Sequence, residues 1–116
     1  MSVTGLQNVT NETATTGTFK NSEHGGNNRD LPAFPVVNVG NAWIPWADNG
    51  DQLKTHHFEI ETGKGTKFVF QSGNSIWSAD SADQKGFDSR ISLFSKVGVS
   101  VNLTIDSDGT LTIAEV

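Results

Sequence analysis

The chain has 116 residues, a formal net charge of −5 and no cysteine, and no stretch concentrates its eight Lys and Arg residues. This length predicts a single domain over residues 1–116, and the lack of cysteine excludes disulfides and thiolate metal sites. Nucleic acid is not expected as a partner, because binding to phosphates needs clustered basic side chains.

The first residues, "MSVTGLQNVT", carry neither the basic segment nor the apolar run of a secretory signal. No apolar run approaches the roughly 20 residues that span a bilayer. We therefore expect a cytoplasmic protein as translated, with release by a non-classical route as the alternative, and we do not expect a membrane as its partner.

The first half of the chain predicts strands over residues 3–10, 14–21 and 34–44. Between the last two, residues 22–32 read "SEHGGNNRDLP", and their Gly, Asn and Pro residues are typical of a long surface loop. No segment shows a sustained helical period with caps.

Two further strands, "HHFEIET" and "TKFVFQ", flank the glycine-rich "GKG" at residues 63–65. A three-residue loop with its last glycine in the left-handed conformation fits this spacing. The pairs that it predicts are Phe58 with Phe70, Ile60 with Phe68, and Glu61 with Lys67.

A two-residue turn at Gly73–Asn74 predicts the next hairpin. Residues 80–89, "DSADQKGFDS", are too polar for a strand, and alternation resumes at Ile91 and Leu93. The pairs expected in this hairpin are Phe70 with Trp77 and Phe68 with Ala79.

Residues 97–105, "VGVSVNLTI", alternate strictly between apolar and small or polar residues, which is typical of a half-buried strand. If residues 107–109 form a three-residue loop, Ile105 lies opposite Leu111 and Leu103 opposite Ile113, so the apolar residues share one face. With about eight short strands and no substantial helix, the chain is predicted to be all-β, an antiparallel β-sandwich or jelly-roll-like fold, with a small β-barrel as the alternative.

The stretch "NAWIPWADNGD" at residues 41–51 holds the candidate ligand-binding residues Trp43, Trp46, Asp48, Asn49 and Asp51. If the strand face that contains Ile44 is buried, Trp46 points inward and Trp43 points outward. A bulge near Gly40 would exchange the directions of the two tryptophans. An exposed tryptophan can stack on the apolar face of a sugar ring, while carboxylate and amide groups take its hydroxyls.

Three carboxylates, Asp80, Asp83 and Asp88, lie in or beside the predicted central loop. Calcium takes several oxygen ligands and tolerates irregular geometry, so this loop is the best candidate for a calcium site. The competing interpretation is ordinary turn chemistry, in which Asp bonds to its own backbone. No other cofactor is expected.

The function predicted from these features is non-catalytic binding of glycans by a small soluble lectin-like protein. In size and composition the chain is similar to small soluble lectins, a likeness that carries no motif. One alternative is a self-associating structural or interaction protein that forms homo-oligomers through an edge strand. Another is a membrane-surface or pore-forming protein, which would need Trp43, Trp46 and Phe87 together on exposed loops. No catalytic motif is present, so an enzyme is not expected.

Overall fold

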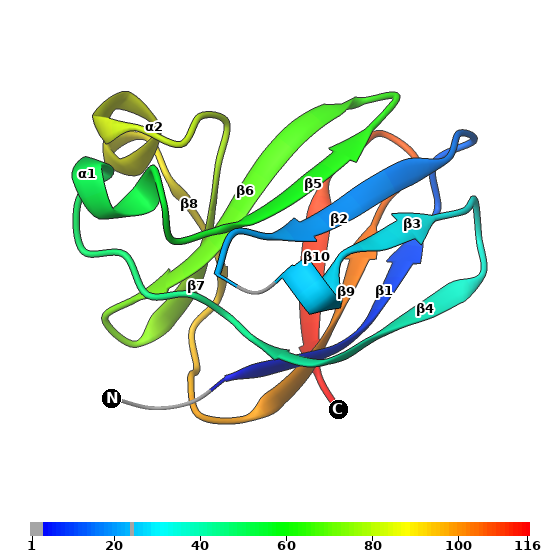
Figure 1. Ribbon diagram of the computed structural model, residues 1–116, viewed down its shortest axis with the longest axis horizontal. Helices are drawn as coiled ribbons and strands as arrows, with labels where there is room; N and C mark the ends of the chain where they lie inside the picture. The colour runs from blue at the N-terminus through cyan, green and yellow to red at the C-terminus, as the bar shows by residue number, and fades with distance from the viewer. Residues whose placement is uncertain (1–3, 24) are drawn as a thin grey trace.

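The computed structural model describes residues 4–23 and 25–116. These residues form two β-sheets packed face to face, one of four strands and one of six, with only short helices beside them (Figure 1). The predicted all-β architecture of two packed sheets is confirmed, and neither sheet closes into a barrel. Val3, where the first strand is predicted to begin, and His24, in the predicted long loop, lie outside the described residues.

The elements follow one another through short connections. The strands are β1 Gly5–Asn11, β2 Gly17–Asn21, β3 Arg29–Leu31, β4 Val36–Trp43, β5 Phe58–Thr62, β6 Gly65–Ser72, β7 Ser75–Ala79, β8 Ile91–Phe94, β9 Ser100–Ile105 and β10 Leu111–Glu115. The helical turns are the 3-10 turn η1 Gly25–Asn27, α1 Gly50–Leu53 and α2 Gln84–Asp88. Within the described residues, no helix is long and apolar enough to cross a membrane.

The four-stranded sheet has the strand order β10-β9-β1-β4, and the six-stranded sheet has the order β3-β2-β5-β6-β7-β8. Paired strands are antiparallel except for β1 and β9, which run parallel. Strand β4 is therefore an edge of the smaller sheet, and the chain leaves that sheet after Trp43. This agrees with the position of Pro45, because proline cannot donate to a ladder and is confined to edges and strand ends.

The apolar core lies between the two sheets, where alternate residues of each strand point inward. Both sheets contribute to it, and the segment after β4 adds Ile44. Its most deeply buried members include Leu6, Val9, Phe19, Val39, Phe58, Ile60, Val69, Ile76, Val101 and Leu103.

A second apolar cluster covers the outer face of the six-stranded sheet beneath α1 and α2. Phe70 of β6 stacks on Phe87 of α2 with ring centroids 5.7 Å apart, and Leu53 of α1 is buried in the same cluster. The Arg90 guanidinium lies 4.6 Å from the centroid of Trp77 and 4.2 Å from that of Phe87. This cation–π arrangement holds the end of α2 on the sheet. Residues 69–71 of β6 are consequently buried on both faces of the sheet.

Two of the three predicted hairpin registers are confirmed. In β6–β7, Phe70 pairs with Trp77 across the predicted turn at residues 73–74. In β9–β10, Ile105 pairs with Leu111, and Gly109 has the positive φ of 91° that the three-residue loop requires. The other predicted pairs in these hairpins, Phe68 with Ala79 and Leu103 with Ile113, are also formed.

The predicted register of β5–β6 is wrong by one residue. Its loop has two residues, Gly63 and Lys64, so Phe58 pairs with Val69 rather than with Phe70. The prediction assumed that the aromatic residues of β6 belong to a single core. Because α1 and α2 create a second one, the register slips by one residue, which turns Val69 inward and Phe70 outward.

The same slip removes the predicted pairs of Ile60 with Phe68 and Glu61 with Lys67. Ile60 lies opposite Lys67, and Glu61 opposite Thr66. Lys67 instead forms an ion pair with Asp80, its Nζ lying 2.5 Å from Oδ1.

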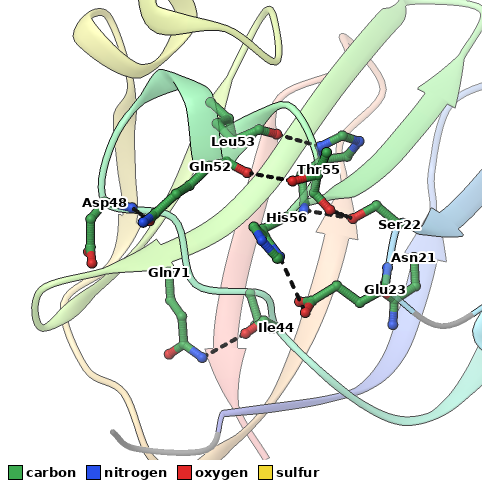
Figure 2. A network of polar contacts seen from close by, with 11 residues as sticks. Asn21, Ser22, Glu23, Ile44, Asp48, Gln52, Leu53, Thr55, His56 and Gln71 are labelled. Carbon is green, nitrogen blue, oxygen red and sulfur yellow. Dashed lines mark hydrogen bonds and ion pairs between the residues drawn. The ribbon is translucent and has the colours of Figure 1, made fainter.

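Gln71 of β6 joins the two sheets through both its side chain and its backbone. Its side chain is 1% exposed; Nε2 donates to the Ile44 carbonyl at 2.7 Å (Figure 2), and Oε1 accepts from the Thr4 hydroxyl at 2.9 Å. Its backbone N–H donates to the Pro45 carbonyl at 2.8 Å, and its carbonyl accepts from Ala47 N–H at 3.1 Å. The segment that follows Trp43 is thereby fixed to the opposite sheet.

We predict that Gln71→Met lowers the free energy of unfolding by about 2–4 kcal/mol, because it leaves the Ile44 carbonyl and the Thr4 hydroxyl without their buried partner. Chemical denaturation followed by tryptophan fluorescence measures this change. The matched control is Gln52→Met, which removes a single solvent-exposed hydrogen bond, from Asp48 N–H, and should cost less than about 1 kcal/mol. Equal losses in the two variants would contradict the proposed structural role of Gln71.

Candidate functional site

The exposed tryptophan is Trp43, at the end of β4. Its side chain is 67% exposed, whereas Ile44 is 2% exposed and Trp46 is partly buried. Trp43 forms part of the wall of an open pocket of about 380 Å³. The pocket is lined by Asn21, Glu23, Asn27, Gly40, Asn41, Ala42 and Trp43, which come from the end of β2, the following turn, η1 and β4.

A bulge in β4 shapes the floor of this pocket. Gly40 and Asn41 both have positive φ, of 79° and 56°. Asparagine is one of the few residues other than glycine that adopts the left-handed conformation readily. The bulge lets Val39 and Ala42 both point into the core although three positions separate them, and so Trp43 faces outward. Left-handed residues of this kind often gather at ligand sites.

The amide side chains of the pocket are fixed by hydrogen bonds. Asn21 Nδ2 donates to Asn27 Oδ1 at 3.0 Å, and Asn27 Nδ2 donates to the Val39 carbonyl at 3.0 Å. Asn21 Oδ1 accepts from the backbone N–H of Glu23 at 3.0 Å. The turn after β2 is thus tied to β4, and the polar groups of the pocket are positioned in advance of any ligand.

Glu23 is the one charged residue that lines this pocket in the described part of the chain. One of its carboxylate oxygens lies 3.4 Å from His56 Nδ1 (Figure 2), and both side chains are nearly half exposed. An ionised carboxylate accepts hydrogen bonds and does not donate them. The pocket therefore combines an aromatic surface, amides that donate and accept, and one strong acceptor.

Asn41 lies over β1 at Gly5. Gln7 Nε2 donates to Asn41 Oδ1 at 2.8 Å, and Gly5 pairs with Trp43 across the two strands. A Cβ atom at Gly5 would overlap Oδ1 and Cγ of Asn41, so a glycine is needed there for this asparagine to keep its place.

The other predicted ligand-binding residues build α1 and do not line this pocket. Asn49 caps α1, its Oδ1 accepting from Gln52 N–H at 2.9 Å, and the Gln52 side chain accepts from Asp48 N–H at 2.7 Å (Figure 2). Asp51 is exposed in the first turn of α1. Trp46 pairs with β6 through a bridge to Gln71. Most of "NAWIPWADNGD" is therefore a strand end and a capped turn.

Each carboxylate of the candidate calcium loop has its own partner. Asp83 caps α2: backbone N–H of Gly86 and the hydroxyl of Ser81 donate to it at 2.9 and 2.8 Å, and they hold the pKa of its carboxyl below the ordinary value. Asp88 accepts from the Gln84 side chain, and Asp80 pairs with Lys67. Over residues 4–23 and 25–116, no three His, Asp or Glu residues form a group that could hold a metal ion.

The sequence analysis did not select four polar residues that line the pocket, namely Asn21, Glu23, Asn27 and Asn41. They lie in segments read as the end of a strand, a surface loop and the next strand, and only the folded chain brings them together. The dense Asn and Gly residues of "NSEHGGNNR" were the available signal, since such residues favour turns with well-placed side-chain hydrogen bonds.

A second open pocket, of about 390 Å³, lies where the edge strands β8 and β10 meet. Ile91, 62% exposed, stands at its border. Its other lining residues are Lys67, Ser78, Ser92, Leu93, Thr110, Leu111, Thr112 and Ile113.

The arrangement required for the membrane-surface alternative is not formed. Phe87 is 9% exposed and stacks on Phe70, on a different sheet from Trp43. No protein-family profile matches the chain, and no curated protein or solved structure matches it either.

We predict that Gly5→Ala lowers the free energy of unfolding by about 1–3 kcal/mol, because the added Cβ displaces the Asn41 side chain. In an Asn41→Gly background the same substitution should cost at least about 1 kcal/mol less, since the three nearest atoms to that Cβ all belong to Asn41. A double-mutant cycle by chemical denaturation measures the difference. Equal costs in both backgrounds would show that Asn41 does not lie over Gly5.

Proposed function

We propose that the protein is a non-catalytic carbohydrate-binding protein and that the Trp43 pocket takes an uncharged sugar. The observation that carries this proposal is the exposed Trp43 ring beside a pocket whose polar lining consists of three amides and one carboxylate. A sugar presents an apolar face of C–H groups and a rim of hydroxyls. The Trp43 ring can stack on the apolar face of the sugar, and the amides and the carboxylate can form hydrogen bonds with its hydroxyls.

The rigidity of the lining supports the same proposal. Asn21 and Asn27 are bonded to each other and to β4, so little side-chain entropy is lost when a ligand binds. Asn21 is buried and acts as a support, whereas the partly exposed Asn27 has more donor and acceptor positions than these bonds use, which leaves groups for sugar hydroxyls.

The carboxylates of the pocket support binding without hydrolysis. Glycosidases generally use a pair of Asp or Glu residues flanking the scissile bond. The described lining of the Trp43 pocket has one carboxylate, Glu23. We therefore propose that a bound glycan is held and released unchanged.

The first experiment is a glycan array with labelled protein, followed by calorimetric titration of the best soluble oligosaccharide. We predict that Trp43→Ala lowers the affinity at least about tenfold, equivalent to about 1.4 kcal/mol, because the stacking surface is lost. Trp43 is exposed, so the variant should remain folded.

Ile91→Ala is the matched control, because Ile91 is an apolar side chain of similar exposure on the other sheet. It should bind the oligosaccharide as the natural chain does. A blank array at high protein concentration, or equal affinities for Trp43→Ala and the natural chain, would count against carbohydrate binding at this pocket.

Self-association is a second candidate function, favoured by the pocket between β8 and β10. Both strands are sheet edges with unpaired backbone groups, and the pocket between them has apolar residues in its lining. A second copy of the chain could pair with such an edge and cover Ile91.

If this edge mediates self-association, Ile91→Lys should shift the protein from dimer to monomer, since it places a charge in the contact. Sedimentation velocity over a hundredfold range of concentration measures this. Trp43→Lys, which adds the same charge on the other sheet, should leave the dimer unchanged. A natural chain that remains monomeric at every concentration would refute this candidate.

A further inference from the structure

Within its strands, the outer face of the four-stranded sheet is almost free of charge, and the nearest carboxylates, Glu12 and Asp106, follow the ends of β1 and β9. Glu115 is the one charged residue within β1, β4, β9 and β10, strands that the structure describes in full. It pairs with Val101, a buried residue, so it belongs to the inward-facing register, and it bonds to Lys96. The strands of the six-stranded sheet, by contrast, carry Lys20, Arg29, Asp30, Glu59, Glu61 and Lys67.

Amides and hydroxyls occupy most of this face in rows across the strands, and the exposed Val36 and Ala114 lie at its two edges. Asn8 of β1 lies opposite Asn38 of β4 and Asn102 of β9, and Asn8 Nδ2 donates to Asn102 Oδ1 at 3.2 Å. Thr10 lies opposite Thr104 of β9 in the next row. Thr112 of β10 extends that second row to the edge of the sheet.

Hydrogen bonds connect this face directly with the Trp43 pocket. Gln7 Nε2 donates to Asn41 Oδ1 in the pocket at 2.8 Å and lies 3.3 Å from the Ser100 hydroxyl on β9. Trp43 itself pairs with Gly5, which pairs with Ser100 on its other side. The pocket and the sheet face therefore form one continuous surface.

We infer that this face binds further units of a neutral glycan chain whose first unit occupies the Trp43 pocket. The inference rests on the proposed carbohydrate binding and adds the class of ligand, an uncharged oligosaccharide or polysaccharide rather than a single sugar. With a strand spacing of about 4.8 Å, the four strands span about 14 Å, and the seven residues of β1 span about 23 Å. This is room for several sugar units.

The scarcity of charge within these strands favours a neutral occupant. Covering a charged side chain with a neutral ligand costs desolvation energy, whereas amides and hydroxyls exchange water for sugar hydroxyls at small cost. An acidic polymer would find no basic partner here and a net charge of −5 on the chain. A neutral glycan meets neither obstacle, and its binding should depend little on salt.

The test uses series of soluble neutral oligosaccharides of one to six units, namely gluco-, manno- and chito-oligosaccharides, titrated into the full chain by calorimetry. For the series that binds, we predict that affinity rises at least about tenfold from the shortest to the longest member and changes less than about twofold between low and high salt.

Asn102→Asp should abolish most of the gain with chain length while leaving the binding of the shortest ligand unchanged. It retains the acceptor for Asn8 but adds a charge that a longer chain must cover. Asn74→Asp, in the exposed turn of the six-stranded sheet, adds the same charge elsewhere and should have no effect. If Asn102→Asp folds poorly, Thr104→Val is the second variant, because it removes one hydroxyl from the face and should also reduce the gain of affinity with chain length. Thr18→Val on β2 is its control and should leave that gain unchanged.

The outcomes separate the two proposals. If the shortest sugar binds and affinity does not rise with chain length, the sheet face takes no part and this inference fails, while the Trp43 pocket stands. Equal length dependence in Asn102→Asp and the natural chain would also overturn it. If no series binds at all, carbohydrate binding itself is refuted.

Discussion

The buried amide of Gln71 is the contact on which the placement of the candidate site depends. Strand β4 ends at Trp43, and the chain must then cross to the six-stranded sheet. Gln71 takes up the backbone groups of Ile44, Pro45 and Ala47 as the chain crosses. Each of these groups would otherwise be buried without a partner, which is costly. The aromatic side chain of Trp43 is therefore exposed at the end of a segment that cannot move freely.

Irregular backbone, rather than the regular part of the sheet, creates the pocket. A strand that alternates without interruption cannot turn both Val39 and Ala42 inward, and the left-handed pair Gly40 and Asn41 makes this possible. The cost of a left-handed asparagine is offset by the bond from Gln7 and by the close fit over Gly5. Bulges at an edge strand also discourage pairing with other chains, so β4 can present Trp43 without inviting aggregation.

Local pattern predicted the elements whose partners are close in sequence. The β9–β10 register followed from alternation and the glycine of the turn. The sequence left open which of Trp43 and Trp46 points outward, because a bulge before them could exchange the two, and the structure has a bulge at Gly40–Asn41 and still exposes Trp43. The β5–β6 register could not be obtained in this way, because it depends on α1 and α2 covering Phe70, a contact between distant segments. The pocket amides were missed for the same reason: Asn27 meets β4 only in the folded chain.

The distribution of charge supports the proposed carbohydrate binding over a generic protein interface. Charged side chains are concentrated on the six-stranded sheet and its helices, where they form pairs such as Lys67 with Asp80. They keep that side solvated, because removing charges from water is expensive. The four-stranded sheet presents side chains that exchange hydrogen bonds with water or with hydroxyls at nearly equal cost. Under the proposed function, affinity on such a surface would come from the aromatic contact and from repetition along a chain. A weak site for one sugar unit at Trp43 would then gain from neighbouring units of the same ligand that bind beside it.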